Sequence, residues 1–278
     1  MNSTETSGNQ PPGDTAKHVE LRDHPSPQGI QRKQLVWVVL PANNEEQCLP
    51  WLLSRIADAM FHSGLAYKVI VVDDGSKDKT ARIAEEYSKH IPVILERHAV
   101  NMGLGATIRD GLTKACQLAD PADVIVSMDA DNSHSPDLIL RMFWSVREGR
   151  DVVIASRYRE GSSTHGVPFV RRILSRVAGW MFQVTFPIPG VRDYTCGFRA
   201  YRAATLQNAL KQYGATFFDQ QGFQCMVDIL LKLSRMKVIF GEVPMVLRYD
   251  LKEGASKMKV AQTVVNTLLL MVKRRFGG

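Results

Sequence analysis

Short apolar runs alternate along the chain with longer segments in which apolar residues recur at helical spacing. The apolar runs predict strands at residues 35–40, 69–72, 93–95, 124–128 and 152–155. The segments between them predict helices at residues 49–61, 79–90, 106–118 and 136–147. Because the strands are hydrophobic at almost every position, we expect both faces of their sheet to be covered. This alternation predicts an α/β fold with a mostly parallel, Rossmann-like sheet flanked by helices.

The regular alternation ends after Ser156. Beyond it the pattern predicts a helix at 171–186, a short strand at 198–201, a helix at 223–233, an extended segment at 237–247 and an amphipathic helix at 257–276. Pro244 places the extended segment at an edge of the sheet, since proline cannot donate to a strand pairing. Residues 1–33 are polar and rich in serine, glycine and proline, which predicts a disordered tail. We therefore expect one domain at 34–256, followed by a C-terminal amphipathic helix at 257–278.

Composition narrows the function classes. The 278 residues carry a formal charge of +7, which favours an anionic partner such as a nucleotide, a nucleic acid or a membrane surface. No nucleic-acid-binding motif is present, so that partner is not expected. Four scattered cysteines predict buried thiols in a reducing compartment. The apolar runs are too short to predict a signal peptide or a membrane-spanning helix.

Polar residues follow each predicted strand of the first half, where ligands bind in open α/β sheets. Pro-Ala-Asn-Asn-Glu begins at Pro41, Asp-Asp-Gly-Ser at Asp73, and Asn-Met-Gly-Leu-Gly at Asn101. Each stretch is also compatible with a simple turn followed by a helix cap. The glycine-rich stretch lacks the third glycine of a dinucleotide-binding loop and the lysine of a phosphate-binding P-loop, so neither class is favoured.

Asp129 and Asp131 are harder to explain as turn residues. They follow a predicted buried strand one residue apart, and two like charges in that position repel each other. A hard divalent cation removes the conflict, because Mg²⁺ and Mn²⁺ take oxygen ligands and bridge carboxylates to a diphosphate. The pair therefore predicts a metal-assisted diphosphate site.

These motifs together resemble family 2 glycosyltransferases of the GT-A fold, and among them the dolichol-phosphate and polyprenyl-phosphate mannosyltransferase group. The matching stretches are VVLPANNEE, VVDDGSKD, NMGLGATIRDG, SMDADNSHSPD, IASRY, DYTCGFRAYR, GFQCMVD and EVPMVLRYDLKEGASKM, in the order typical of the family. They cover roughly residues 34–260 of the chain.

The resemblance implies a role for each matching residue. The implied nucleotide-sugar contacts are Pro41, Asn43, Glu45, Asp74, Asn101, Gly105, Arg248 and Lys257, with Asp74 on the base. The implied metal site is Asp129, Asp131 and Ser133, the last standing where relatives often have glutamine. The implied contacts to an acceptor phosphate are Arg157, Arg171 and Ser175, and the implied catalytic residues are Asp129, Asp131 and Asp228.

The implied reaction is an inverting, Mg²⁺- or Mn²⁺-dependent sugar transfer from GDP-mannose or UDP-glucose to a polyprenyl phosphate. A phosphate acceptor needs no strong base, whereas a hydroxyl acceptor would need one, for which Asp193, Asp219 and Asp228 are candidates. Two alternatives stay open: a transferase that acts on a hydroxyl, and a catalytically silent subunit that binds a nucleotide sugar.

A membrane surface is a further expected partner. Arginines share the segment 171–186 with Trp180 and other large apolar residues, a composition typical of helices that lie in the headgroup region. The final helix, with Lys273–Arg275, offers a second contact and could equally pack on the sheet or form an oligomer. We expect a protein bound peripherally to the cytoplasmic face of a membrane.

Overall fold

The computed structural model describes residues 34–251 and Arg274, and for Val170 and Arg171 it describes the backbone alone. The predicted tail at 1–33 lies outside the described residues. The predicted C-terminal helix at 257–278 also lies outside them, except for Arg274.

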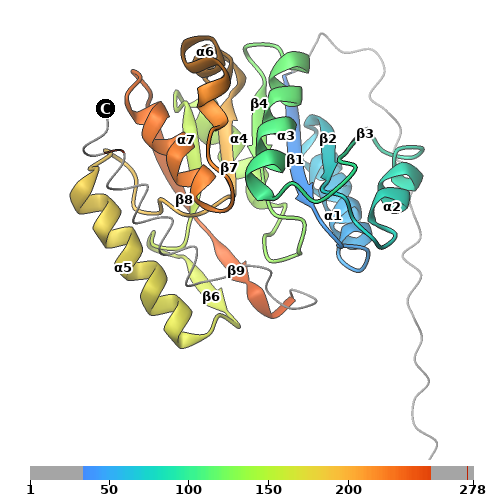
Figure 1. Ribbon diagram of the computed structural model, residues 1–278, viewed down its shortest axis with the longest axis horizontal. Coiled ribbons are helices and arrows are strands. Elements are labelled where there is room, and N and C mark those ends of the chain that lie inside the picture. The colour runs from blue at the N-terminus through green and yellow to red at the C-terminus, as the bar shows by residue number, and fades with distance from the viewer. Residues whose placement is uncertain (1–33, 252–273, 275–278) are drawn as a thin grey trace, which may run out of the picture.

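A seven-stranded sheet runs through the middle of the molecule in the order β3-β2-β1-β4-β7-β5-β8 (Figure 1). Its strands are β1 (Leu35–Ala42), β2 (Ala66–Asp73), β3 (Val93–Arg97), β4 (Val124–Ser127), β5 (Val152–Ser156), β7 (Arg199–Arg202) and β8 (Phe240–Pro244). The pairings are parallel except at β7, which runs antiparallel to both β4 and β5. The predicted α/β fold with a mostly parallel sheet is confirmed.

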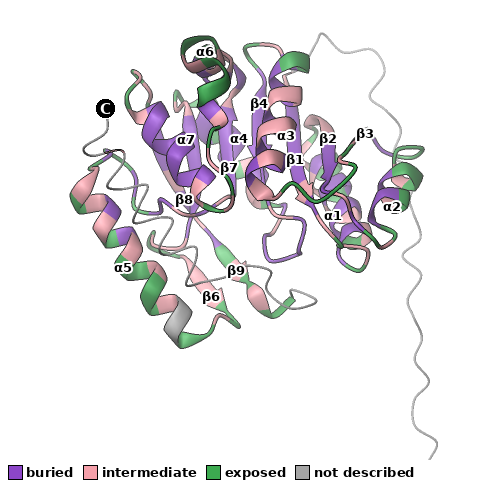
Figure 2. Cartoon of the chain, in the orientation of Figure 1, coloured by how far each residue is buried: buried purple, intermediate pink, exposed green. Residues whose placement is uncertain are grey.

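Helices cover both faces of this sheet. One layer contains α1 (Leu49–Ser63), α2 (Thr80–Tyr87) and α4 (Leu138–Arg147), with α1 in contact with the other two. The other contains α3 (Leu104–Leu118), α6 (Ala203–Tyr213), the 3₁₀ turn η1 (Gly214–Phe218) and α7 (Gln224–Ser234). The strands between these layers are largely buried, as their apolar sequences predict (Figure 2).

A smaller unit lies beyond the carboxyl ends of the strands. The chain leaves β5 and forms β6 (Ser163–His165) and then α5 (Phe169–Thr185), and it leaves β8 to form β9 (Val246–Arg248) and η2 (Tyr249–Leu251). β6 and β9 pair in parallel as a separate ribbon. Figure 1 shows the ribbon and α5 below the main sheet, so both add to the edge where the strand-end loops meet.

The helix ends follow local sequence rules. Gly64 ends α1 with φ 64°, the left-handed conformation that glycine adopts without a steric cost. Pro136 lies just before α4, and its carbonyl accepts from Ile139 N at 2.9 Å. This hydrogen bond forms a turn that leads into the helix, a position that suits the fixed backbone angle of proline. Pro244 lies on β8, which is an edge strand, so the predicted edge is also confirmed.

The strand β7, which lies between β4 and β5, contains a buried arginine. The Arg199 side chain is completely buried, and its guanidinium donates to the carbonyls of Met226 at 2.6 Å and Tyr194 at 2.8 Å. Buried carbonyls that accept from a guanidinium offset part of the cost of removing it from water. The side chain thus links β7 to the start of α7 and to the loop that precedes β7.

Gly111 fixes how closely α3 approaches the sheet. A Cβ at this position would overlap Val39 Cγ1 and lie 3.0 Å from Val72 Cγ2, and both valines are fully buried in the sheet. We expect Gly111→Ala to lower the free energy of unfolding by about 1–3 kcal/mol, because the core cannot yield at this point. Gly179→Ala is the matched control, since its Cβ would meet Tyr158 Cε2 at 3.6 Å and Arg192 O at 3.8 Å, both ordinary van der Waals distances. Denaturant unfolding of both variants measures the difference, and equal stabilities would contradict this account.

Candidate functional site

The loops after β1 and β2 hold each other in place. Asn43 Nδ2 donates to Asp74 O at 2.8 Å, Asn44 N donates to Ser76 Oγ at 2.9 Å, and Glu45 N donates to Thr80 Oγ1 at 2.8 Å. Pro41 is half-buried near the end of β1. Two of the predicted nucleotide contacts, Asn43 and Glu45, therefore lie on a loop that is hydrogen-bonded to its neighbour, and the third, Pro41, lies at the end of the strand that leads into it.

Asp74 connects this pair of loops to the glycine-rich loop. Its side chain is 5% exposed, and its two oxygens accept from Met102 N and Gly103 N, each at 2.8 Å. His98 Nδ1 lies 2.7 Å from Asp74 Oδ1 as well. The carboxylate that the sequence assigns to the nucleotide base thus also sets the shape of the loop beside it.

Two glycines allow these loops to approach one another closely. A Cβ on Gly75, which has φ 62°, would lie 2.5 Å from Val100 C. A Cβ on Gly105 would overlap Gln220 O and lie 2.8 Å from Gln221 Cα, so the first turn of α3 packs directly on the segment that precedes α7. Asn101 is exposed at the start of the same loop. Segments far apart in the sequence thus converge next to Asn101 and Gly105.

The aspartate pair lies in the loop after β4. Asp131 is buried, and its Oδ1 accepts from Ser133 Oγ at 2.5 Å and from Ser133 N at 3.1 Å. Asp129 is half-buried, with its backbone N–H 3.4 Å from His134 Nδ1. Asn132 adopts φ 61°, and its buried Oδ1 has no hydrogen-bond partner in the described part of the chain.

This donor set fits a hard divalent cation. Two carboxylates, a hydroxyl and an amide oxygen occur within five residues, and oxygen is the ligand atom that Mg²⁺ and Mn²⁺ prefer. The unsatisfied amide oxygen of Asn132 is a feature that sequence reasoning missed, although its position within the motif could have suggested it. Across the described residues, no three histidine, cysteine, aspartate or glutamate side chains are grouped so that they could hold a metal ion, so the aspartate pair would need the hydroxyl or amide oxygen as a further ligand.

Arg248 approaches the same loop through its backbone. Its N–H donates to Ser133 O at 3.0 Å, so the β6–β9 ribbon is attached to the aspartate loop. Its exposed guanidinium binds Asp250 instead, with Nη2 2.8 Å from Asp250 Oδ2. A diphosphate contact from Arg248 would require it to leave Asp250. Lys257, its predicted companion, lies outside the described residues.

Arg157 is held by a second buried carboxylate. Its Nε and Nη2 donate to the two oxygens of Asp193 at 2.8 and 2.7 Å, and Nη2 also donates to Thr195 Oγ1 at 2.6 Å. Burial alone would raise the pKa of Asp193, but the charge and hydrogen bonds of Arg157 outweigh burial and hold the pKa below its usual value. Asp193 thus fixes the direction of the arginine.

Ser175 lies close to Arg157 through an aromatic ring. The Arg157 guanidinium lies 5.5 Å from the ring centre of Tyr158, whose hydroxyl is 2.8 Å from Ser175 Oγ on α5. Two of the three predicted acceptor-phosphate residues are therefore joined by one intervening side chain. The side chain of the third, Arg171, lies outside the described residues, and its backbone is in the first turn of α5.

Asp228 belongs to a cluster of two carboxylates and two positively charged side chains. Asp228 lies 2.6 Å from Lys232 Nζ and 2.7 Å from Arg274 Nε, and Asp219 lies 2.8 Å from the same Lys232 nitrogen. Arg274 Nη2 also approaches Asp219 Oδ1 at 3.3 Å. Although burial opposes it, hydrogen bonds led by Lys232 bring the pKa of Asp219 well below its usual value. Asp219 and Asp228, two of the three candidate general bases, are therefore strongly ion-paired.

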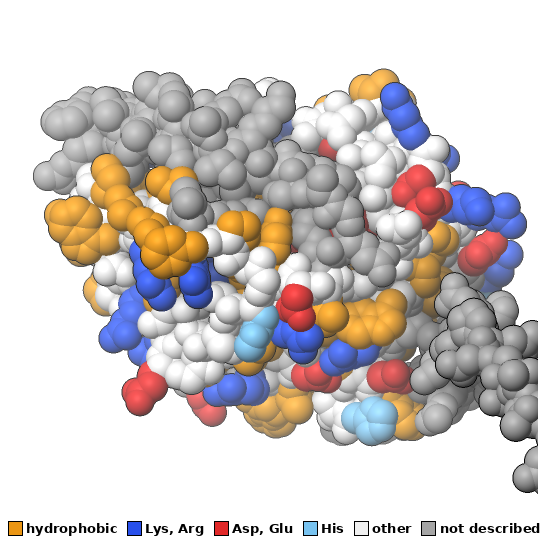
Figure 3. Space-filling view, turned by 90° about the horizontal axis from the view of Figure 1, so that it is seen from below, with side chains coloured by type: hydrophobic (Ala, Val, Ile, Leu, Met, Phe, Trp, Pro, Cys, Tyr) orange, Lys and Arg blue, Asp and Glu red, His pale blue; other side chains and the backbone are white. Residues whose placement is uncertain are grey.

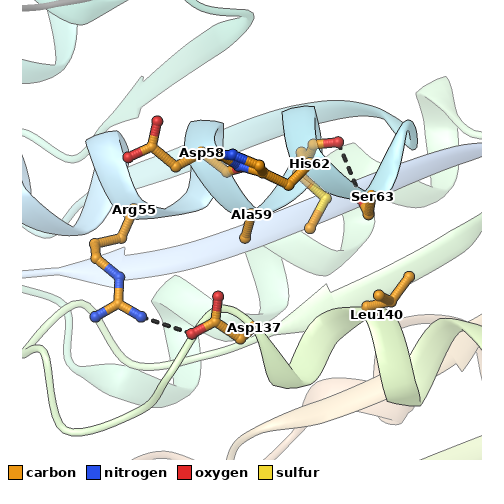
Figure 4. Close-up of a pocket in the computed structure, with 8 residues that line it drawn as sticks. Arg55, Asp58, Ala59, His62, Ser63, Asp137 and Leu140 are labelled. Carbon is orange, nitrogen blue, oxygen red and sulfur yellow. Dashed lines mark hydrogen bonds and ion pairs between the residues drawn. The ribbon is translucent and has the colours of Figure 1, made fainter.

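A separate hollow of about 390 Å³ lies on the α1–α4 side of the molecule. Figure 4 shows Arg55 of α1 reaching toward Asp137, with which it forms an ion pair of 2.6 Å, and Asp58 and His62 lie on the same helix. None of the predicted site residues lines it. We therefore assign the candidate site to the strand-end loops and not to this hollow.

The solved structures that resemble this chain share its architecture. Glucosyl-3-phosphoglycerate synthase from Mycobacterium tuberculosis, in complex with Mn²⁺, UDP and glucosyl-3-phosphoglycerate, matches with a TM-score of 0.58 and 20% identity over 86% of this chain and 80% of that one. Mannosyl-3-phosphoglycerate synthase from Rubrobacter xylanophilus matches with a TM-score of 0.57 and 17% identity over 87% and 74%. Their likeness defines a GT-A fold.

The sequence comparisons define the family. Residues 37–211 match the profile of Glycosyl transferase family 2, and the chain therefore belongs to glycosyltransferase family 2. It is 33% identical over 225 residues to dolichol-phosphate mannosyltransferase of Pyrococcus furiosus, covering 81% of this chain but 59% of that protein. It is 32% identical over 251 residues to undecaprenyl-phosphate mannosyltransferase of Micrococcus luteus, covering 87% and 96%. The expected resemblance to polyprenyl-phosphate mannosyltransferases is confirmed, and the chain is a glycosyltransferase.

The Arg157–Asp193 pair predicts a loss of stability in acid. Because the pKa of Asp193 is lower in the folded state, its contribution is complete above the ordinary value of 3.8 and is lost as the pH falls below it. We expect Asp193→Asn to be less stable at neutral pH by about 3–5 kcal/mol, since Arg157 loses its buried partner. We also expect this variant to lose less further stability on acidification below about pH 4.

Thermal unfolding at a series of pH values measures both effects. Asp137→Asn is the control, because its exposed ion pair with Arg55 contributes little. An acid transition of Asp193→Asn that parallels that of the unsubstituted protein would contradict the assignment.

Proposed function

We propose that this glycosyltransferase is an inverting enzyme that moves a hexose from GDP-mannose or UDP-glucose to a polyprenyl phosphate. Its relatives include polyprenol monophosphomannose synthase of Mycolicibacterium smegmatis, which is 30% identical over 234 residues, 84% of each chain. The structural observation that carries the proposal is the ion pairing of Asp193, Asp219 and Asp228, the three candidate bases.

A hydroxyl acceptor must lose a proton during transfer, and the base that takes it works best with a pKa near the working pH. In Asp193 and Asp219 the pKa is shifted downward, by Arg157 and Lys232 respectively, against the effect of burial. Asp228 contacts Lys232 and Arg274 directly. A phosphate acceptor is already ionised at neutral pH and needs positioning instead. The ion pairing therefore favours a phosphate.

Arg157 still has hydrogen-bond donors with which to bind an acceptor phosphate. In its described hydrogen bonds, the side chain donates through Nε and Nη2, to Asp193 and Thr195, and it is 20% exposed. Nη1 thus stays available for an oxygen of an incoming phosphate. A guanidinium that Asp193 already orients loses little conformational entropy when it binds.

For the donor, we assign the nucleotide to the strand-end segments that carry Pro41, Asn43, Glu45, Asn101 and Gly105. Asp129 and Asp131 would hold Mg²⁺ or Mn²⁺, with Ser133 orienting Asp131 through the 2.5 Å bond. When bound, the cation would stabilise the negative charge that develops on the leaving diphosphate. Backside attack by the acceptor phosphate would invert the anomeric carbon.

A radiolabel transfer assay tests this function. GDP-[¹⁴C]mannose and UDP-[¹⁴C]glucose are incubated separately with the protein, Mn²⁺ or Mg²⁺, and a short polyprenyl phosphate in detergent. We expect metal-dependent label in the organic phase, and Asp131→Asn to lower the rate at least about 100-fold because charge stabilisation is lost. Asp137→Asn, a nearby carboxylate paired with Arg55, should keep the full rate.

Other outcomes of this assay select the alternatives. Transfer to a saccharide hydroxyl, with none to the lipid phosphate, would refute the proposed acceptor. Donor binding without turnover in any condition would indicate a silent binding subunit.

We also propose that α5 binds the membrane that contains the acceptor. Phe169, Ile173, Val177, Trp180 and Val184 are exposed on this helix. Figure 3 shows apolar side chains gathered beside basic side chains on the face seen from below, and Arg172 and Arg176 belong to α5. Exposed apolar and basic groups suit an anionic headgroup region. In residues 34–251, no helix is long and apolar enough to cross a bilayer.

Vesicle co-sedimentation tests the role of α5. We expect Trp180→Glu to reduce binding to anionic phosphatidylglycerol vesicles about ten-fold, because a charge replaces an indole that is 64% exposed. Trp144→Glu on α4 is the matched control, since that indole is 54% exposed on another part of the surface and should not affect binding. Equal losses in the two variants would contradict a specific role of α5.

A further inference from the structure

His98 lies between two carboxylates next to the proposed nucleotide site. Its Nδ1 is 2.7 Å from Asp74 Oδ1, and its Nε2 is 3.0 Å from Asp110 Oδ2 on α3. The side chain is 10% exposed, so water competes poorly for either contact. Sequence reasoning gave His98 no role, because the residue precedes the recognised glycine-rich motif by three positions.

This geometry distinguishes the two protonation states of the ring. A neutral imidazole has one N–H and one lone pair, so it can donate to only one of the two carboxylates and directs its lone pair at the other. The imidazolium donates to both and forms two charge-assisted hydrogen bonds. The contacts with Asp74 and Asp110 therefore suit the protonated ring, and histidine changes its charge between about pH 5 and pH 8.

Nearby charges stabilise the anionic form of Asp110. Arg109 donates to Asp110 at 2.7 and 3.0 Å, and although burial opposes it, this contact and His98 lower the pKa of Asp110. On β3, the neighbouring Arg97 is directed at Asp73 Oδ2 at 3.2 Å.

One further ion pair joins α3 and β3. Lys114 and Glu96 lie 2.8 Å apart and neutralise each other. Among the described residues, the charged groups that face the ring directly are the carboxylates of Asp74 and Asp110.

The same carboxylate shapes the glycine-rich loop. Asp74 accepts from Met102 N and Gly103 N in addition to His98, so the ring, the carboxylate and the loop backbone form one connected network. We propose that protonated His98 is a positioning residue of the donor site, which holds Asp74 and the loop at 101–105 in the form that binds the nucleotide. Nucleotide-sugar affinity then rises as the pH falls. This inference rests on the proposed function, because it concerns the same donor site.

Isothermal titration calorimetry with GDP-mannose and UDP-glucose, in the presence of Mg²⁺, measures the effect. These donors are preferable to GDP or UDP, because their diphosphate has no terminal phosphate that titrates near neutral pH. We expect the unsubstituted protein to bind its donor about ten-fold more tightly near pH 5.5 than near pH 8, as two charge-assisted bonds replace one.

Three variants isolate His98. His98→Gln should bind the donor weakly at every pH, with most of the pH dependence lost, because glutamine donates from one end of its side chain only. His98→Arg carries a permanent charge and should restore tight binding without the pH dependence. His90→Gln changes an exposed histidine after α2 and should behave like the unsubstituted protein. Thermal unfolding of each variant without donor separates a loss of affinity from a loss of fold.

The possible results separate this inference from the proposed function. Donor binding with the same pH profile in His98→Gln and the unsubstituted protein would overturn the role of His98 and leave the proposed function intact. Failure of the unsubstituted protein to bind either donor at any pH would overturn both. Long-range ¹H–¹⁵N spectra give an independent check, since a neutral His98 ring near pH 6 would also refute the inference.

Discussion

The negative charge of each buried carboxylate at the carboxyl edge of the sheet needs a hydrogen-bond donor or a cation beside it, and these partners determine how the loops of the site are held together. Asp74 is compensated by backbone amides and His98, Asp193 by Arg157, and Asp228 by Lys232 and Arg274. Removing one partner of such a buried pair costs roughly 3–5 kcal/mol, since the other charge stays in a medium of low polarity. Each acid therefore fixes the segment that supplies its partner, and a set of separate loops becomes one rigid surface.

The same compensation limits the chemistry of the site. An aspartate that is strongly stabilised as an anion holds cations and amides well but accepts a proton poorly. Asp193 and Asp219 are in this state, so the acidic residues of the second half serve as orienting groups for Arg157 and Lys232. A reaction whose nucleophile arrives already ionised suits such a site. Under the proposed function, the stability of the fold and the choice of acceptor thus depend on the same ion pairs.

The sequence predicts the first half of the molecule better than the second. Strands such as β1 and helices such as α3 are strongly periodic, and the polar residues that follow them fall at the sheet edge that the topology requires. The antiparallel direction of β7 could not be predicted, because an apolar run shows that a strand is buried but not which way it runs. The helix α6 and the fully buried Arg199 were missed as well, since both depend on tertiary contacts.

A similar division applies to the site residues. Asp129 and Asp131 are adjacent to a recognisable turn, and the contacts of Asp131 with Ser133 follow from local sequence. Arg157 pairs with Asp193, which is 36 residues away, and Asp228 pairs with Arg274, which is 46 residues away. Only the folded chain brings these partners together. The proposed donor half is built on strand-end loops whose motifs are readable in the sequence, whereas the proposed acceptor half depends on long-range ion pairs. Under the proposed function, changes of acceptor can arise in the second half without altering the loops assigned to the nucleotide.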